Sequence, residues 1–376
     1  MRARLPGSTL GMLGGGQLGR MFVTAARSMG YEVIVLDPDR NSPAGGLANE
    51  HLAKDYDDRE ALDYLARRCA VVTTEFENIP ALTLAYLAKS VAVHPSARAL
   101  HIAQHRKLEK EFFPEQGLQT AEFVAIENQA DVDAARDFTF PAILKTATLG
   151  YDGKGQVVCQ DFGDLEAAFA EVGGKPCVLE QRIDLACEVS VVLCRSLEGV
   201  VECFPIAQNS HANGILDVSQ VPASINDDLA RQAISAATKI AQGLDYCGVL
   251  AVELFIFTDG QLLVNEMAPR PHNSGHYTLD ACDSSQFEQQ VRMICGLSAG
   301  SCRQHTAVAM WNLLGDIWPE TGTPAWDQIL RLERVKLHLY GKKEARVGRK
   351  MGHVNCLGDS LEEALALLEQ VRGILS

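Results

Sequence analysis

The feature that most restricts the fold of this chain is a change in the spacing of its apolar residues about halfway along. Residues 9–96 alternate short β-rich runs, such as YEVIVLD and AVVTTE, with amphipathic helical stretches at 17–29, 59–68 and 81–89. Strands separated by helices favour a parallel sheet with right-handed crossovers. Beyond Glu188 the runs lengthen and meet at hairpin turns, as in VLAVELFIFT-DG-QLLVNEM, which is typical of antiparallel sheets. The sequence therefore predicts an α/β, Rossmann-like first domain followed by an α+β part built on antiparallel sheets.

Further changes in pattern divide the chain into four segments. Its 376 residues suit two or three domains of ~150 residues each. A long polar helix, expected over residues 97–116, leads from the first domain into a mixed region, and an amphipathic helix over residues 360–371 ends the last segment. We expect a Rossmann-like domain at 1–105, a small subdomain at 106–183, a larger subdomain with the hairpin at 184–300, and a C-terminal extension at 301–376.

Charge and cysteine content exclude several classes of function. The chain carries 34 Lys and Arg against 48 Asp and Glu, for a net charge of −14, and a field of that sign repels nucleic acids. The 11 cysteines are scattered without a C-x-x-C pair, so neither a zinc site nor a disulfide framework is indicated. No apolar run approaches the ~18 residues of a membrane span. We expect a soluble, cytoplasmic protein with at least one basic island, residues 336–353, which has six Lys or Arg against one Glu. This island is either a site for anionic substrates or a solvated surface strand.

A glycine-rich motif lies between the first predicted strand and the first helix. Residues 14–19, GGGQLG, fit G-x-G-x-x-G, and Asp37 ends the next strand. These are the conditions of a dinucleotide fingerprint, but the same geometry also suits a monophosphate or a turn that binds nothing. Glu75 and Glu77 follow the third strand, where ligands of such sheets bind. Their carboxylates suit sugar hydroxyls or an amine, or serve only as surface caps.

The predicted hairpin sets two carboxylates against each other. If Asp259-Gly260 forms a two-residue type I′ turn, Glu253 and Glu266 lie directly opposite in strands apolar enough to be buried. Like charges in that position destabilise a hairpin, so either one carboxyl is protonated or a cation lies between them. Mg²⁺ is the natural choice if phosphates complete its shell. Asn265 has the opposite parity, so its participation requires a bulge or a backbone contact.

Lysines and a second glycine loop indicate anion binding in the middle of the chain. Lys145 lies within the apolar strand AILKTA, and the loop GYDGKG at 150–155 follows it. The loop lacks the Lys-Ser/Thr ending of a P-loop, which excludes Walker-type NTPases. A flexible loop that carries Lys154 can still close over nucleotide phosphates, although a surface loop without function has the same composition. Residues 180–183, EQRI, end a strand at the change of domain and suit a hinge that contacts an adenine edge.

Together these motifs resemble the ATP-grasp ligases, and among them the N5-carboxyaminoimidazole ribonucleotide synthetases of purine biosynthesis. The resemblance is carried, in order along the chain, by GGGQLGRM, TTEFENIP, RKLEK, GYDGKGQ, VLEQRI, the pair Glu253 and Asn265-Glu266, APRPHNSGHYT and GRKMGH. It implies an ATP-grasp fold after the first domain. It also implies a reaction in which ATP phosphorylates bicarbonate to carboxyphosphate, which the amine of 5-aminoimidazole ribonucleotide then attacks.

The resemblance also assigns roles to residues. For ATP it implies Arg106, Lys145, Gly150, Gly153, Lys154, Gly155, Glu180, Gln181, Arg182, Ile183, Glu188, His211, Asn265 and Glu266, with Mg²⁺ on Glu253 and Glu266. For the ribonucleotide it implies Gly16, Gln17, Leu18, Glu75, His272, Asn273, Lys342 and Arg349. For catalysis it implies Asp152, which would manage a proton, Lys342, which would stabilise carboxylate oxygens, and Tyr151 and Arg270.

Two other functions compete with this one. Another ATP-grasp ligase, or a formyltransferase, could act on a phosphoribosyl amine with formate or an amino acid as donor. A nicotinamide-dependent oxidoreductase would rest only on residues 14–19 and Asp37, and it leaves the opposed glutamates unexplained. Family precedent and the apolar strands near Glu188 indicate a homodimer.

Overall fold

The first domain is a parallel five-stranded sheet with helices on both faces. In the structure, a computed structural model that describes residues 3–148 and 155–375, alternate residues of the second strand enter different cores: Val33 and Val35 on one face, Ile34 and Leu36 on the other. The predicted parallel sheet is confirmed, with the order β3-β2-β1-β4-β5. The elements are β1 (Thr9–Leu13), α1 (Gln17–Ser28), β2 (Glu32–Leu36), β3 (Glu50–Leu52), α2 (Arg59–Arg68), β4 (Val71–Thr74), α3 (Ala81–Leu87) and β5 (Ala92–Val93).

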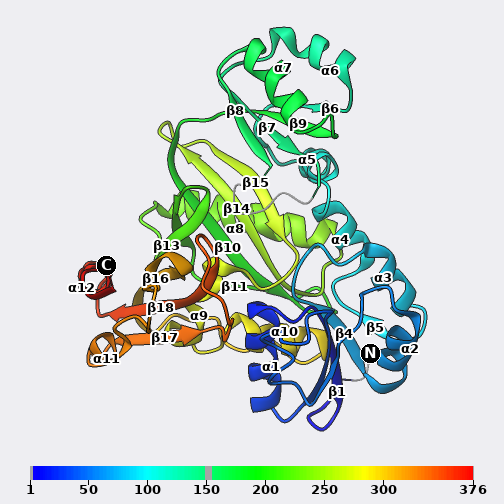
Figure 1. The fold of residues 1–376 in the computed structure, drawn as a ribbon, viewed down its shortest axis with the longest axis vertical. Helices are drawn as coiled ribbons and strands as arrows, with labels where there is room; N and C mark the ends of the chain where they lie inside the picture. The colour runs from blue at the N-terminus through cyan, green and yellow to red at the C-terminus, as the bar shows by residue number, and fades with distance from the viewer. Residues whose placement is uncertain (1–2, 149–154, 376) are drawn as a thin grey trace.

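One helix that covers this sheet comes from much later in the chain. Phe287, Val291 and Ile294 of α10 (Gln286–Ile294) share a core with Phe22 and Val23 of α1. Figure 1 shows α10 beside α1, against the blue sheet. The first domain and the later hairpin region are therefore packed together through a common core.

The second unit is a four-stranded antiparallel sheet that projects from the body of the molecule (Figure 1). Its strand order is β6-β9-β7-β8, and Leu144 and Leu179 bury its inner face against Leu165 and Phe169. Gly155 adopts φ +69° directly before β8, the strand at one edge of this sheet. The elements are β6 (Phe123–Ile126), α6 (Gln129–Ala134), η1 (Ala135–Asp137), β7 (Ala142–Thr146), β8 (Gln156–Cys159), α7 (Phe162–Glu171) and β9 (Cys177–Gln181).

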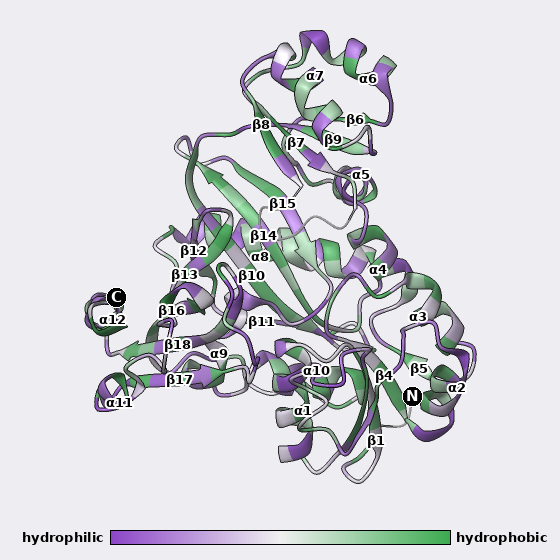
Figure 2. Cartoon of the chain, in the orientation of Figure 1, coloured by the Kyte–Doolittle hydropathy of each residue, from purple (hydrophilic) through white to green (hydrophobic). Residues whose placement is uncertain are grey.

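The largest sheet has nine strands and runs through the middle of the molecule. Its order is β15-β14-β10-β12-β13-β16-β18-β17, with β11 paired to β10, and every pairing is antiparallel. Figure 2 shows the long strand β14 as mostly hydrophobic, in keeping with its burial. The strands are β10 (Leu185–Arg195), β11 (Val201–Cys203), β12 (Ala207–Ala212), β13 (Ile215–Val221), β14 (Gly248–Phe257), β15 (Leu262–Ala268), β16 (Ala307–Leu314), β17 (Val335–Leu339) and β18 (Lys350–Gly358).

Helices cover this sheet at both of its ends. Ala233, Ala237 and Ile240 of α8 pack on the hairpin side, and Leu368 and Val371 of α12 pack under the C-terminal strands. In the part of the chain that the structure describes, no helix is both long and apolar enough to cross a bilayer. The remaining elements are α8 (Asp227–Gly243), η2 (Asn273–Gly275), α9 (Thr278–Ala281), η3 (Gly315–Ile317), α11 (Trp326–Ile329) and α12 (Leu361–Leu375).

The single helix predicted over residues 97–116 is wrong. Two helices occupy this segment, α4 (Ala97–Ala103) and α5 (Arg106–Glu115). The helix is interrupted because the side-chain amide of Gln104 donates to the carbonyl oxygens of Glu77 and Ile79, while His105 has extended backbone angles. The N–H of Arg106 then donates to the carbonyl oxygen of Ala147, at 2.9 Å. These tertiary contacts turn α5 toward the second unit, which a polar helical pattern does not reveal.

The basic island predicted at residues 336–353 is not one solvated strand. It contains β17, a loop at 340–349 and the start of β18, and its last residue, His353, is fully buried. His353 stacks on His338 with ring centroids 4.5 Å apart, and it lies 4.7 Å from the ring of His276. Its Nδ1 lies 2.9 Å from the hydroxyl of Tyr340. The basic loop is therefore anchored on a buried histidine stack.

The histidine stack predicts a loss of stability in acid. Burial lowers the pKa of His353 well below its ordinary value, and His276 and His338 lower it further. The unfolded chain binds a proton at this residue below about pH 6.5, whereas the folded chain does not, so its contribution to stability is lost as pH falls. In urea denaturation, the free-energy gap between the wild type and His353→Gln should narrow by about 1.4 kcal/mol between pH 7.5 and 5.5. His305→Gln, at an exposed histidine, is the matched control, and an equal narrowing there would refute this explanation.

Candidate active site

The hairpin β14–β15 places Glu253 directly opposite Glu266, as predicted. The predicted two-residue turn is nevertheless wrong, because the N–H of Phe257 bonds to the carbonyl oxygen of Gln261 and three residues span the turn, with Gly260 at φ +84°. The longer turn alone shifts the register by one residue. A β-bulge that leaves Asn265 unpaired shifts it back. The two offsets cancel. The bulge is also one of the two arrangements that would let Asn265 take part in the site.

One imidazole and one guanidinium group lie beside the carboxylate pair and offset its charge only in part. Burial, and then the charge of Glu266, raises the pKa of Glu253 to about 8. Nε2 of His272 lies 3.3 Å from Oε1 of Glu253, and Nη1 of Arg106 lies 3.4 Å from Oε2 of Glu266. Two facing carboxylates, beside an amide at the bulge, are the hard oxygen donors that Mg²⁺ prefers. In residues 3–148 and 155–375 no group of three or more His, Cys, Asp or Glu could hold a metal by itself, so a bound ion would need ligands from phosphate and water.

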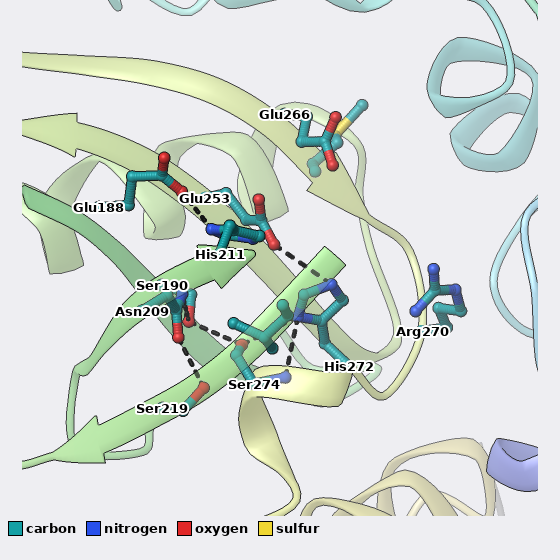
Figure 3. A network of polar contacts seen from close by, with 12 residues as sticks. Glu188, Ser190, Asn209, His211, Ser219, Glu253, Glu266, Arg270, His272 and Ser274 are labelled. Carbon is teal, nitrogen blue, oxygen red and sulfur yellow. Dashed lines mark hydrogen bonds and ion pairs between the residues drawn. The ribbon is translucent and has the colours of Figure 1, made fainter. Parts of the chain in front are cut away.

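A chain of buried hydrogen bonds orients His272 beside Glu253 (Figure 3). The backbone N–H of Ser274 donates to Nδ1 of His272 at 3.3 Å, and the Ser274 hydroxyl lies 2.8 Å from the same nitrogen. Ser190 and Asn209 continue this chain into the sheet at 2.7 and 3.1 Å. Because Nδ1 accepts a backbone N–H and Nε2 faces a carboxylate, neutral His272 carries its hydrogen on Nε2. The imidazole therefore presents a donor to the carboxylate pair.

Glu188 and His211 extend the polar row along neighbouring strands. Oε2 of Glu188, on β10, lies 2.8 Å from Nδ1 of His211, on β12. Burial would lower the pKa of His211, but the hydrogen bond and charge of Glu188 outweigh it and raise the pKa. Figure 3 shows both side chains beside Glu253, on the same side of the sheet. The structure therefore brings together these two residues and the carboxylate pair, as the resemblance implied.

Lys145 and Glu180 form a buried ion pair on the two central strands of the second unit. Nζ of Lys145, on β7, lies 3.0 Å from Oε2 of Glu180, on β9. Gln181, Arg182 and Ile183 follow Glu180 and line a cavity together with hairpin side chains that include Phe257 and Leu263. The predicted hinge therefore lies between the second unit and the hairpin.

Helix α5 contributes two buried titratable side chains that sequence reasoning did not assign. Oε1 of Glu109 accepts the N–H of Met267 at 2.7 Å, next to Glu266 on β15. Lys110 lies 3.1 Å from the Glu180 carboxylate. The only available signal was their place in the motif RKLEK.

The first glycine loop is held by the chain's own carboxylates. Glu75 accepts the N–H groups of Gly16 and Gly19, the latter at 2.6 Å, and Asp37 accepts the N–H of Gly15 at 2.7 Å. A Cβ at Gly16 would lie 2.7 Å from a Glu75 oxygen, so close approach by this carboxylate requires the glycine. Asp37 also accepts the hydroxyl of Tyr56 at 2.8 Å, so the loop and Tyr56 take the carboxylate that a dinucleotide fingerprint would offer to a ribose. In the described part of the chain no hydrogen bond is formed by the N–H groups of Gln17 and Leu18, at the start of α1.

Arg270 joins the end of the hairpin to the first domain. Its guanidinium donates through two nitrogens to the carboxylate of Glu77, with Nη2 to Oε1 at 3.1 Å. Burial would lower the pKa of Arg270, but Glu77 outweighs it and raises the pKa. Glu77 is the second carboxylate of TTEFENIP, and its partner lies 193 residues away. The sequence showed both residues without showing that they pair.

The basic loop reaches toward the first domain from the other side. Nζ of Lys343 donates to Oδ1 of Asn41 at 2.8 Å, and the backbone at Gly341 lies near the guanidinium of Arg20 on α1. Lys342 donates to the carbonyl oxygen of Lys350 at 2.7 Å, and Arg349 donates to that of Glu344 at 2.9 Å. Lys342 and Arg349 therefore belong to a loop that faces the start of the glycine-loop domain.

Several residues with expected roles lie outside the described ranges. These are Gly150, Tyr151, Asp152, Gly153 and Lys154.

A hinge between a small antiparallel unit and a larger sheet, with opposed carboxylates on the larger sheet, defines the class of ATP-grasp enzymes. Residues 111–287 match the family model of the ATP-grasp domain. Residues 8–104 match that of the ribonucleotide synthetase preATP-grasp domain, and residues 308–367 match the phosphoribosylaminoimidazole carboxylase C-terminal domain.

Whole-chain comparisons show the particular family. The N5-carboxyaminoimidazole ribonucleotide synthase of Brucella melitensis is 46% identical over 352 residues, 93% of this chain and 96% of the relative. The Bacillus subtilis enzyme of the same name is 41% identical over 95% and 93% of the two chains. A solved N5-carboxyaminoimidazole ribonucleotide synthetase in complex with ADP superposes with a TM-score of 0.93, 43% identity and coverage of 99% and 98%. The Aspergillus clavatus synthase, solved with ADP and 5-aminoimidazole ribonucleotide, gives 0.91, 30% identity and 98% coverage of both chains.

The chain belongs to the N5-carboxyaminoimidazole ribonucleotide synthase family. It is an ATP-dependent carbon–nitrogen ligase of purine biosynthesis, which carboxylates 5-aminoimidazole ribonucleotide. The oxidoreductase alternative is wrong, in agreement with the carboxylates that occupy the glycine loop.

Proposed function

We propose that this chain carries out the reaction through carboxyphosphate formed from bicarbonate, at the carboxylate pair of the hairpin. The observation that carries the proposal is that Glu253 and Glu266 lie directly opposite each other on the hairpin. The hinge with its buried lysines lies on one side of this pair, and the first domain with its glycine loop lies on the other. Bicarbonate oxygen attacks the terminal phosphate of ATP and ADP leaves. The amine of the ribonucleotide then attacks the carboxyl carbon, phosphate departs, and the amine gives up a proton.

Glu253 and Glu266 are proposed to hold Mg²⁺, with Asn265 beside them at the bulge. When bound there, Mg²⁺ would neutralise charge on the phosphate oxygens. The support is that the hairpin holds two carboxylates directly opposite each other, at a place where burial raises the pKa of Glu253. When Glu253 binds Mg²⁺, the Nε2 hydrogen of His272 would be free to donate to the phosphate oxygens.

The nucleotide is proposed to lie between the hinge and the hairpin. Lys145 suits a phosphate because its only described partner is a carboxylate that it shares with Lys110. Glu188 and His211 lie on the sheet beside Glu253. Contacts with ATP are therefore proposed for Arg106, Lys145, Glu180, Gln181, Arg182, Ile183, Glu188, His211, Asn265 and Glu266, with the loop residues Gly150, Gly153, Lys154 and Gly155.

The ribonucleotide is proposed to lie between the glycine loop and the basic loop. The N–H groups of Gln17 and Leu18 sit at the positive end of α1, which favours an anion such as a phosphate. Binding roles are proposed for Gly16, Gln17, Leu18, Glu75, His272, Asn273, Lys342 and Arg349. Arg270 and Lys342 would stabilise carboxylate charge, and Tyr151 and Asp152 are proposed for the amine and its proton.

An isotope experiment tests the carboxyphosphate route. Release of ADP is expected to depend on both bicarbonate and the ribonucleotide, and ¹⁸O from labelled bicarbonate should appear in the phosphate product. The label moves because the oxygen that attacked ATP leaves with phosphorus. Mass spectrometry of phosphate after single turnover measures it. Unlabelled phosphate would defeat the route, and turnover with formate in place of bicarbonate would favour a formyl-transferring ligase.

We also propose a cytoplasmic setting and a homodimer. All 11 cysteines are free thiols, nine of them buried, which suits a reducing compartment. The apolar side chains after Glu188 that first indicated a dimer, such as Val191 and Leu193, are buried within the chain itself. The exposed apolar side chains Val200 and Ile234 are better candidates for a subunit contact, and light scattering of wild type and a double serine variant tests them.

A further inference from the structure

Lys110 is a buried charge for which the proposed reaction has no use. It lies on α5 with 2% of its surface exposed, between the hinge strand and the hairpin. Its Nζ lies 3.1 Å from Oε2 of Glu180 and donates to Oγ1 of Thr120 at 3.0 Å. The Thr120 hydroxyl in turn donates to the carbonyl oxygen of Val264, on the hairpin, at 2.9 Å. A lysine is expensive to bury, so a position like this requires a reason.

The reason lies in the carboxylate that Lys110 shares. Lys110 and Lys145 both approach the same oxygen, Oε2 of Glu180, at 3.1 and 3.0 Å. One ammonium group is enough to neutralise one carboxylate, and two of them this close repel each other. Burial would raise the pKa of Glu180, but the two lysines outweigh it and keep the carboxyl ionised. In this trio one positive charge exceeds what Glu180 needs.

The two lysines differ in what else holds them. Lys110 has a second partner in Thr120 and is almost completely enclosed, whereas Lys145, 7% exposed, lies on β7, the strand that leads into the glycine loop at residue 150. Lys145 is therefore the lysine that can turn toward an anion. If it were the only cation beside Glu180, its departure would leave a buried carboxylate unpaired, which is strongly unfavourable.

We propose that Lys110 is the permanent counterion of Glu180, which allows Lys145 to leave the carboxylate and bind the phosphates of ATP. Lys110 is thus a positioning residue that acts through Glu180 and Lys145. The inference rests on the proposed role of Lys145 in nucleotide binding.

Substitution of Lys110 by methionine tests this role, because methionine keeps an unbranched side chain only one atom shorter and removes its charge. Lys110→Met should weaken ATP binding by about tenfold or more, since Lys145 is then held by Glu180. Binding of adenosine, which has no phosphates, should change by less than about twofold. Titration calorimetry measures both, and ribonucleotide affinity checks the fold. Lys107→Met is the matched control: Lys107 lies on the same helix and pairs with Glu127 at the surface, at 2.7 Å.

A second background separates this mechanism from simple damage to the hinge. In Glu180→Gln protein there is no carboxylate to hold Lys145, so adding Lys110→Met should weaken ATP binding by less than about threefold. An equal effect in both backgrounds, or unchanged ATP affinity in Lys110→Met, would overturn the proposal. If Lys110→Met does not fold, Lys110→Gln, which keeps a donor for Thr120, takes its place in the same comparison. Unchanged ATP affinity in Lys145→Met would instead refute the proposed role of Lys145.

Discussion

Replacement of Glu266 by glutamine is expected to lower kcat by about a thousandfold while ribonucleotide affinity stays within about twofold. Glutamine keeps the size of the side chain and one acceptor oxygen, but it removes half of the negative charge of the pair that Glu253 and Glu266 form across the hairpin. A divalent cation between the two strands needs that charge, because hard oxygen ligands with full negative charge hold Mg²⁺ most strongly. ADP release at saturating substrates measures kcat, and calorimetry measures ribonucleotide binding.

The control is Glu202→Gln, at an exposed glutamate on β11, which should leave both quantities unchanged. Glu253→Gln should resemble Glu266→Gln, because the two carboxylates form one site. Full activity of Glu266→Gln would show that the opposed pair is not where the metal and phosphates meet. Loss of ribonucleotide binding together with activity would indicate that the hairpin shapes the substrate pocket instead.

Replacement of Arg270 by glutamine is expected to cost both stability and substrate binding. The change leaves the half-buried Glu77 carboxylate without its two-nitrogen partner, and breaking one side of a largely enclosed ion pair typically costs about 3 kcal/mol. The pair joins the hairpin end to the loop after β4, so its loss also releases the two surfaces between which we place the ribonucleotide. We expect a decrease of about 3 kcal/mol in unfolding free energy and at least a hundredfold rise in the ribonucleotide KM.

Two further variants show whether loss of the Arg270–Glu77 pair is the cause. Arg303→Gln breaks a similar two-nitrogen pair with Asp283 at the surface, at 3.0 and 3.2 Å, and should cost less than about 1 kcal/mol. The double variant Arg270→Gln with Glu77→Gln should recover part of the lost stability, because no charge is then left unpaired, but not the substrate affinity. Recovery of both would assign Arg270 a purely structural role.

The opposed carboxylates show how a prediction can succeed through two errors. The sequence indicated a turn at Asp259-Gly260, and the structure has a turn there that is one residue longer. The bulge at Asn265 restores the register. Turn chemistry reports only four or five residues, whereas the bulge depends on how β15 fits against its neighbours, so no local pattern could have shown that the offsets cancel.

The contacts missed by sequence reasoning are those between residues that are distant along the chain. Glu77 pairs with Arg270, Lys110 with Glu180, and Glu109 with the backbone of Met267. A charged residue on an amphipathic helix normally faces water, and nothing local distinguishes Lys110 from Lys107. The break between α4 and α5 was missed for the same reason, since contacts from Gln104 to residues 77 and 79 cause it.

The sequence by itself determined the parallel first domain, the change to antiparallel sheets, the glycine loop and the hairpin that carries the glutamates. Each of these features depends on a local pattern of a few residues. The period of apolar residues distinguishes strands from helices, and the residue types at a turn indicate where strands meet. Only the tertiary structure decided that Glu75 and Asp37 take the glycine-loop amides, that Arg270 joins Glu77, and that two lysines share Glu180. These contacts depend on which charged residues, distant along the chain, the fold brings together. An unpaired buried charge is costly, and whether a charge finds a partner depends on its neighbours in space and not on its neighbours in sequence.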